Sequence, residues 1–152
     1  MSASFRVEPL SGDQVAQALP LVQVTWPQAD MAAWRDFVEF FSAPDARGGI
    51  LALRDPADYL CGILVYRLLQ DVEAGRILEV PLFTTVDMAN SLRIVRALLD
   101  AAENRASELG CAELQIRLQR DQSGLSGRLR RLGLTSNVEV MSMPIEAPQK
   151  SN

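Results

Sequence analysis

The stretch Arg76 to Gly110 constrains the fold most, because it joins a strand directly to the longest helical pattern in the chain. Arg76 to Thr85 is an apolar, strand-like run. From Asp87 to Leu109, apolar residues recur at steps of three and four, the spacing of one buried helix face, and Gly110 ends the helix. Ala112 to Arg120 alternates apolar and polar residues. A strand–helix–strand crossover is therefore expected.

The chain before this crossover predicts one strand and two helices. Ser4 to Leu10 alternates as a strand. A helix follows the N-cap residue Ser11, and Pro20 is expected to interrupt or shorten it. A second helix, with an aromatic stripe at helical spacing, is expected from Asp30 to just before Pro44.

Three strands with tight links come next. Ile50 to Arg54 and the long apolar run Tyr59 to Asp71 precede Arg76 to Thr85, which predicts an antiparallel meander. Pro81 lies inside the third strand. Since proline cannot donate to a strand ladder, we expect that strand to bulge or lie unpaired there.

After the crossover, a short helix is expected from Gly124 to Leu132 and a last strand from Val138 to Pro144. The order is β-α-α-β-β-β-α-β-α-β. We expect one α/β domain of the mixed α+β type over residues 1–145, with a mostly antiparallel sheet of six or seven strands and four flanking helices. Residues 146–152 are expected to form a flexible tail.

Charge and composition exclude several kinds of function. Fifteen Lys and Arg against nineteen Asp and Glu give a net charge of −4, without the basic stripe that binds nucleic acid. The absence of histidine removes Ser-His-Asp catalysis and the common zinc sites, so no metal is expected. No apolar run approaches the ~18 residues of a membrane span, and the N-terminus lacks a signal pattern, so we expect a cytoplasmic protein and no membrane partner.

Two cysteines, Cys61 and Cys111, each lie in an apolar, strand-like run. We interpret them as buried free thiols rather than a disulfide or a reactive site. Because the chain has no histidine, any acid or base must be Asp, Glu, Lys, Tyr, Cys or water.

Several segments resemble the GNAT superfamily of acyl-CoA N-acyltransferases over nearly the whole chain. GGILALRD and YLCGILVYR resemble the second and third strands of that family, RALLDAAENRASELG its cofactor-side helix, and LRRLGL the end of its last helix. The resemblance implies that the strand before the long helix splays from its neighbour. It also implies that the exposed backbone of Phe83, Thr84 and Thr85 holds the pantetheine arm of acetyl-CoA.

The resemblance further implies a pyrophosphate-binding loop at the start of the long helix, where bare amides and the helix dipole favour anions. That loop falls on Asn90, Ser91, Leu92, Arg93, Ile94 and Val95. Asn90 holds the arginine position of the family pattern, and Arg93 and Val95 hold its two glycine positions. We expect these side chains to crowd a phosphate, and Asp87 to cap the helix with a repelling carboxylate. Alternatively, Arg93 supplies charge to the phosphate.

On the catalytic side, the position of the family tyrosine acid is Leu129, and that of the asparagine starting the last helix is Gln122. The other family device is a carboxylate on the splayed strand, which corresponds to Glu79 as the base that takes the amine proton, directly or through water. A solvated surface position is the alternative for Glu79. Tyr66 is a second polar candidate, or a wall residue.

The resemblance implies a GNAT-like N-acetyltransferase that transfers an acyl group from acetyl-CoA, or another acyl-CoA, to a small-molecule or peptide amine. Whether the chain is an enzyme stays open. The alternative function is a catalytically inactive GNAT-fold binding or regulatory module that does not bind acetyl-CoA in the usual way. A homodimer also stays open.

Overall fold

The computed structural model describes residues 4–86 and 92–146. Its elements follow the predicted order up to the last helix: β1 (Arg6–Pro9), a 3-10 turn η1 (Gly12–Gln14), α1 (Val15–Thr25), α2 (Met31–Ser42), β2 (Gly48–Arg54), β3 (Leu60–Asp71), β4 (Gly75–Thr85), α3 (Leu92–Glu108), β5 (Glu113–Ile116) and α4 (Ser123–Arg131).

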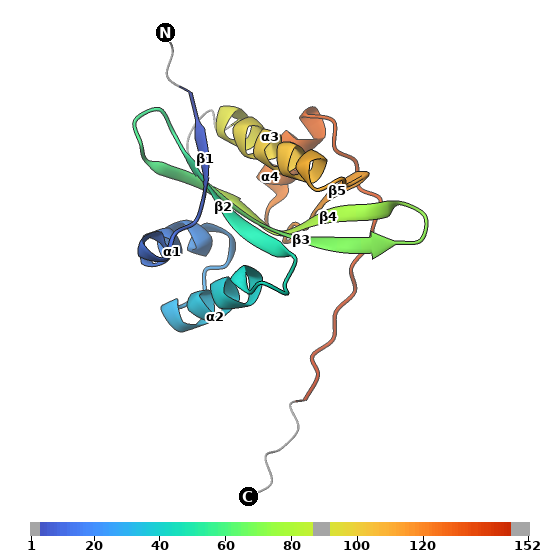
Figure 1. Ribbon diagram of the computed structural model, residues 1–152, viewed down its shortest axis with the longest axis horizontal. Coiled ribbons are helices and arrows are strands. Elements are labelled where there is room, and N and C mark those ends of the chain that lie inside the picture. The colour runs from blue at the N-terminus through green and yellow to red at the C-terminus, as the bar shows by residue number, and fades with distance from the viewer. Residues whose placement is uncertain (1–3, 87–91, 147–152) are drawn as a thin grey trace, which may run out of the picture.

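The strands form one mixed sheet in the order β1-β2-β3-β4-β5 (Figure 1). All neighbouring pairs are antiparallel except β4 and β5, which are parallel because α3 crosses over between them. The predicted α+β class and meander are confirmed. The sheet has five strands within the described residues, however, fewer than the six or seven that the sequence predicted.

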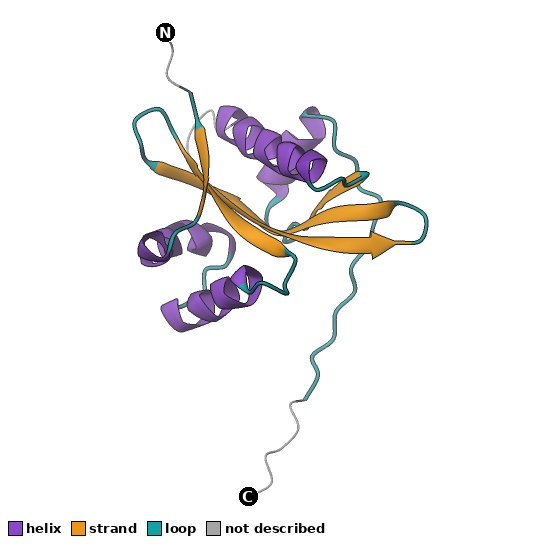
Figure 2. Cartoon of the chain, in the orientation of Figure 1, coloured by secondary structure: helices purple, strands orange, loops and turns teal. Residues whose placement is uncertain are grey.

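Helices cover both faces of the sheet (Figure 2). Helices α1 and α2 pack on one face, where Trp34 and Phe41 meet Ile63 and Val65. Helices α3 and α4 pack on the other, around a larger group of buried residues that includes Leu64, Leu78, Val80, Leu98 and Leu129. Successive β3 residues thus enter opposite cores, which explains why this strand reads as an unbroken apolar run.

Helix α1 runs through Pro20, so the expected interruption is wrong. Proline removes the hydrogen bond to the carbonyl of Ala16 four residues earlier. Both residues are exposed, so water can satisfy that carbonyl. The helix ends at Thr25, just before Trp26 and Pro27.

Helix α2 begins where its capping residue predicts. The Asp30 side chain accepts a hydrogen bond from the Ala33 amide at 2.8 Å, which satisfies an otherwise unpaired donor of the first turn. One turn later, the fully buried Trp34 donates from Nε1 to the Val15 carbonyl at 2.7 Å. That bond joins α2 to the start of α1 and fixes the two helices as one layer.

The structure shortens one predicted strand and removes another. β5 is paired only over Glu113–Ile116, not from Ala112 to Arg120, because β4 diverges from it beyond Val80. The expected last strand, Val138 to Pro144, is extended and exposed but joins no sheet in the described part of the chain. An alternating apolar and polar sequence favours an extended backbone, but a β-strand also needs the edge of a neighbouring strand for its hydrogen bonds.

Two further observations concern absences within residues 4–86 and 92–146. No helix there is both long and apolar enough to cross a bilayer. No three acidic, cysteine or histidine side chains gather there in a way that could hold a metal ion.

The two-core arrangement predicts how helix α3 responds to truncation. Leu98→Ala should lower the free energy of unfolding by ~2–5 kcal/mol, because it leaves a cavity at a fully buried position. Leu92→Ala, on the same helix but 37% exposed, should change it by less than about 0.5 kcal/mol. Urea unfolding followed by circular dichroism measures both. Equal losses would contradict the packing described.

Cys61 is buried as expected, whereas Cys111 is only partly buried, so the inert thiol of the folded protein should be Cys61. Burial raises the pKa of Cys61 to about 11, and its Sγ donates to the Leu53 carbonyl at 3.4 Å. In a Cys111→Ser background, Ellman's reagent at mildly alkaline pH should therefore label nothing until urea is added. Rapid labelling of the folded variant would show that Cys61 is accessible and ionised.

Candidate functional site

Strand β4 carries a bulge at Val80 and Pro81. Leu82 pairs with Val65 on β3 and Glu79 pairs with Arg67, so two β4 residues lie opposite the single residue Tyr66. The expected irregularity at Pro81 is confirmed, and its cause is the missing amide donor of proline. A bulge bends its own strand and increases the local twist, so β4 changes direction there.

The pairing of β4 with β5 stops at the same point. The last paired residues are Val80 and Ile116, followed by one bond from the Arg117 amide to the Val80 carbonyl at 3.0 Å. β4 continues to Thr85 with β3 on one side and no strand on the other within the described residues. The two segments are no longer paired beyond this point, and the region between residues 81–85 and the chain that follows β5 is called the wedge below.

The three residues expected to hold a pantetheine arm lie on this free length of β4. The Phe83 side chain is buried, and its strand position pairs with Leu64. Thr84 is also buried, and its Oγ1 donates to the Leu21 carbonyl of α1 at 3.1 Å. With these side chains engaged, the backbone edge of Phe83, Thr84 and Thr85 is the part of β4 that can meet a ligand in the wedge.

The side of the wedge next to α1 is bridged by Gln122. Its Nε2 donates to Thr25 Oγ1 at 3.1 Å, and its Oε1 accepts from the Gln119 amide at 2.7 Å. The residue expected to begin the last helix does precede α4, but its side chain connects the loop after β5 to the end of α1. These hydrogen bonds of Gln122 fix the distance between the two sides of the wedge.

Helix α3 begins beside the end of β4, and its first turn carries the residues at the two glycine positions. Val95 is fully buried, so its methyl groups face the core and not the helix end. Arg93 is exposed, and its guanidinium lies 6.0 Å from the centre of the Phe5 ring. The expected crowding of a phosphate by these side chains stays a prediction. Asp87, Asn90 and Ser91 lie outside the described residues.

Glu79 sits on the face of β4 opposite Leu78 and Val80, as its place in the strand predicts. Its Oε1 accepts a hydrogen bond from Arg67 Nε at 2.7 Å, and the Glu79 side chain is only 17% exposed. Glu79 also lines a groove of about 1130 Å³ that follows β5. The carboxylate is therefore neither a freely solvated surface group nor an isolated buried acid, but one half of a partly buried ion pair.

No hydroxyl occupies the position of the family tyrosine. Leu129, on α4, is buried in the core that α3 and α4 share with the sheet. Tyr66 is buried on that same face, and its hydroxyl accepts a hydrogen bond from Arg105 Nε at 2.9 Å. Of the two polar side chains predicted for catalysis, Glu79 lines the groove beside β5, whereas Tyr66 lines a second cavity.

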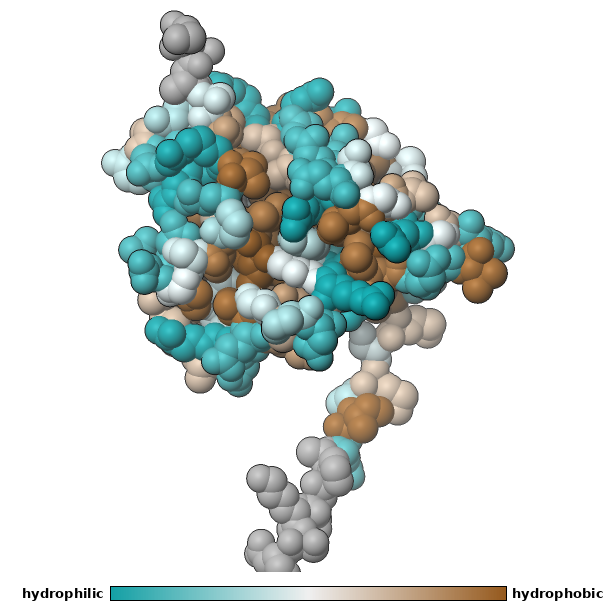
Figure 3. Space-filling view, viewed as in Figure 1, coloured by the Kyte–Doolittle hydropathy of each residue, from teal (hydrophilic) through white to brown (hydrophobic). Residues whose placement is uncertain are grey.

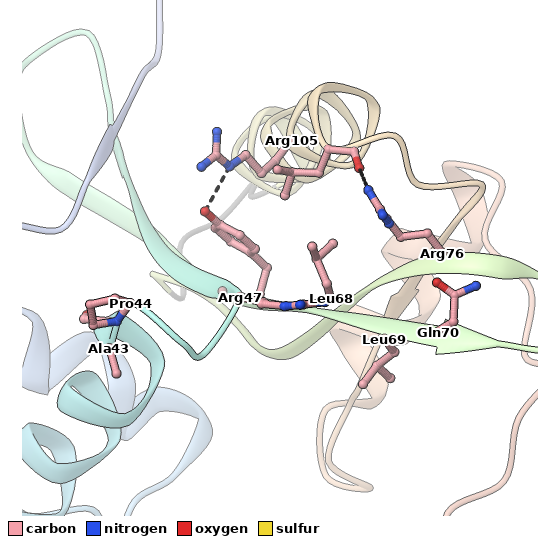
Figure 4. Close-up of a pocket in the computed structure, with 12 residues that line it drawn as sticks. Ala43, Pro44, Arg47, Leu68, Leu69, Gln70, Arg76 and Arg105 are labelled. Atoms are coloured by element: carbon pink, nitrogen blue, oxygen red, sulfur yellow. Dashed lines mark hydrogen bonds between the residues drawn. The ribbon is translucent and has the colours of Figure 1, made fainter.

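A second cavity of about 670 Å³ lies at the opposite end of the sheet, beside the end of α3 (Figure 4). Three arginines line it: Arg47, Arg76 and Arg105. Arg105 holds the Tyr66 hydroxyl, and Arg76 Nη1 donates to the Leu109 carbonyl just after α3 at 3.0 Å (Figure 4). Arg76, on β4, binds a carbonyl at the C-terminal end of α3, and such a cation stabilises a helix C-terminus. Arg105, on α3, binds Tyr66 of β3, so both arginines connect α3 to the sheet.

The Gly48-Gly49 pair beside this cavity belongs to β2. A Cβ on Gly49 would lie 2.6 Å from the Tyr66 hydroxyl. Glycine is needed here because the Tyr66 ring crosses the neighbouring strand at close range.

Sequence reasoning missed two features of the site, the Arg67 partner of Glu79 and the Gln122–Thr25 bridge. Side chains alternate between the two faces of a strand, so Arg67 lies on the same face of β3 as Ile63 and Val65. Glu79 pairs with Arg67 and lies on that same face of the sheet. The pairing could have been deduced once the register was known. The bridge joins residues 97 positions apart, so no local pattern could have indicated it.

Comparison with protein-family models and with curated proteins gives no match. Solved structures do match. An aminoglycoside N-acetyltransferase in complex with CoA superposes with a TM-score of 0.77 at 12% identity, covering 97% of this chain and 98% of that one. The ribosomal-protein-alanine N-acetyltransferase from Brucella melitensis biovar Abortus 2308 gives 0.75 at 15% identity, covering 93% and 100%.

A transcriptional regulator from Bacillus halodurans C-125 gives a TM-score of 0.75 at 14% identity, covering 93% of this chain and 99% of that one. At such identities the likeness establishes architecture and leaves activity open. The chain therefore has the fold shared by the GNAT N-acetyltransferases.

Proposed function

We propose that this chain is an N-acyltransferase that uses acetyl-CoA, or another acyl-CoA, and a small-molecule or peptide amine. One observation carries the proposal: the bulge at Pro81 frees an edge of β4 directly before the N-terminus of the seventeen-residue helix α3. A free strand edge offers amides and carbonyls to an extended, amide-containing arm. A helix N-terminus offers unpaired amides and a positive dipole end to a phosphate.

The residues of the wedge fit such a ligand. The backbone edge of Phe83, Thr84 and Thr85 would hold the pantetheine arm, and the loop from Asn90 to Val95 the pyrophosphate. Because Val95 is directed into the core, it does not compete for that space. Arg93 is exposed in the first turn of α3, where it can add positive charge in place of a glycine amide.

In the reaction, acetyl-CoA supplies a thioester whose acyl carbon is open to attack by an amine. The amine nitrogen forms the new amide bond as the carbon–sulfur bond breaks. In our proposal the proton lost by the nitrogen passes through water to Glu79 and from there to the departing thiolate. Arg67 orients Glu79, because its Nε donates a hydrogen bond to Glu79 Oε1 at 2.7 Å.

A second candidate is a binding or regulatory module with the same fold and no transfer activity. The observation in its favour is Leu129, a core residue where the family has a tyrosine acid. The two candidates differ in whether acyl-CoA binds productively, and the experiments below separate them.

Binding can be tested by calorimetry and thermal shift with acetyl-CoA. At 100 times its dissociation constant, the ligand should add ~2.7 kcal/mol to the free energy of unfolding. Arg93→Glu should weaken binding by about tenfold, because it reverses a charge near the phosphates at a helix N-terminus. Arg96→Glu makes the same charge change at an exposed position one turn further along α3 and should have a smaller effect.

No stabilisation at millimolar acetyl-CoA would favour the binding module and reject the acyltransferase. Equal weakening by the two charge reversals would instead reject the placement of the pyrophosphate at the start of α3.

Catalysis can be tested with Glu79→Gln, which retains an oxygen acceptor for Arg67 and removes the base. Release of free CoA thiol is measured against a primary alkylamine, a peptide with a free α-amino group and an aminoglycoside. The turnover number should fall by about 10²–10⁴-fold, with the Kd for acetyl-CoA unchanged.

The matched control is Glu113→Gln, a carboxylate on the neighbouring strand that lines the same groove. Its turnover should stay close to that of the unaltered protein. A Glu79→Gln enzyme with the original rate and pH profile would remove Glu79 as the base while leaving acyl transfer itself intact.

A further inference from the structure

The second cavity, beside the C-terminal end of α3, is a positively charged region in an acidic protein. The described residues that line its about 670 Å³ include Arg47, Arg76 and Arg105 but no aspartate or glutamate. The chain as a whole carries a net charge of −4. Because like charges gathered in one concave site attract counter-ions, the cavity favours an anion.

The pairing of the strands brings the three arginines to one face of the sheet. Figure 4 shows Leu68 directed from β3 toward α3, and Gln70 lies on the same face because side chains alternate along a strand. The Leu68 amide donates to the Arg47 carbonyl at 3.0 Å, and Gln70 pairs with Arg76. Both arginines therefore lie opposite β3 residues that face α3, and α3 itself supplies Arg105.

The guanidinium groups keep donors and charge for a further partner. Arg105 uses Nε for Tyr66 and Nη1 for Glu108, and Arg76 uses Nη1 for a backbone carbonyl. Each guanidinium has five N–H donors, so these bonds fix the groups in place without exhausting them. Glu108 is the only carboxylate in the described part of the chain that forms an ion pair with any of the three arginines. Two of the three positive charges therefore lack an acidic partner there.

The Tyr66 hydroxyl is a second and independent indication of a ligand. Tyr66 is only 5% exposed and lines the cavity. Its oxygen accepts from Arg105 Nε at 2.9 Å, and its own proton has no acceptor among residues 4–86 and 92–146. A buried donor without an acceptor is unfavourable, and an anion bound beside Arg105 would supply the acceptor.

The size and the apolar part of the lining indicate a small organic molecule. About 670 Å³ lies in the range of small-molecule sites. Pro44, Leu68 and Leu109 line the cavity together with the arginines. In the space-filling view, hydrophilic and hydrophobic groups lie next to one another on the surface between α2 and α3 (Figure 3). Such a lining suits charged groups joined by a short hydrocarbon chain.

We propose that the second cavity binds a small organic dianion, with carboxylate or phosphate oxygens that accept hydrogen bonds from Arg47, Arg76, Arg105 and the Tyr66 hydroxyl. Guanidinium groups bind both kinds of oxyanion in bidentate fashion, and two negative charges match the two arginine charges without an acidic partner. Glu79 lies on the opposite face of the sheet, so this site is separate from the proposed acyl-transfer site and does not rest on it.

Isothermal titration calorimetry at constant ionic strength tests the site on the full chain. The probes are succinate and glutarate as dicarboxylates, glycerol 3-phosphate as a phosphate ester, inorganic phosphate, and acetate as a monoanion. At least one organic dianion should bind with a Kd below about 1 mM, and acetate at least about tenfold more weakly. The stronger of the dicarboxylates and the phosphate ester identifies the preferred oxyanion. No heat from any organic dianion up to about 10 mM would reject the site.

Two variants locate the binding. Tyr66→Phe should raise the Kd about tenfold, because it removes the hydroxyl donor. Arg47→Asn should raise it by at least as much. The φ of Arg47 is 52°, a left-handed conformation that asparagine adopts readily, so the thermal midpoint of this variant should not fall.

The matched control is Arg35→Gln, which removes an exposed arginine of α2 that does not line the cavity. Its Kd should equal that of the unaltered chain. Equal weakening by Arg35→Gln and Arg47→Asn would show attraction to overall charge only and would overturn the proposal. Unchanged affinity in both Tyr66→Phe and Arg47→Asn would place the bound dianion elsewhere and overturn it as well.

Discussion

The hydrogen-bond ladder of β4 is broken by one residue, and the rest of the architecture is arranged around that break. Pro81 has no amide to donate, so β4 bulges against β3 and parts from β5 at the same level. The parallel pair is stable up to Val80 because α3 and α4 bury its inner face. Beyond Val80, side-chain hydrogen bonds such as the one from Gln122 to Thr25, rather than strand pairing, connect the two sides of the wedge.

Burial on both faces makes this break tolerable. Leu82, Phe83 and Thr84 follow the bulge, and each is almost wholly buried although one edge of their strand is unpaired. Apolar contact on two faces holds the backbone of β4 where hydrogen bonds alone would not. The unpaired amides and carbonyls of this length are consequently fixed in position, which is what a binding edge requires.

The acyltransferase proposal concerns the inner edge of β4 beyond the bulge, which has no strand partner within the described residues. That edge comes directly before a helix N-terminus, which suits an extended ligand with phosphates. Glu79 lies on the same strand before the bulge, lines the groove beside β5 and is hydrogen-bonded to Arg67.

The sequence by itself determined the class of fold, the order of elements up to the last helix and the irregularity at Pro81, because hydrophobic period, caps and proline chemistry are local properties. It placed Glu79, Phe83, Thr84 and Thr85 on the strand before the long helix, with Glu79 facing away from Leu78 and Val80. Only the tertiary structure decided that Val95 is directed into the core, that Arg67 pairs with Glu79, and that residues 138–144 find no edge in their own sheet. Those outcomes depend on register and on which surfaces meet, and contacts between residues far apart in the chain leave no periodic trace in the sequence.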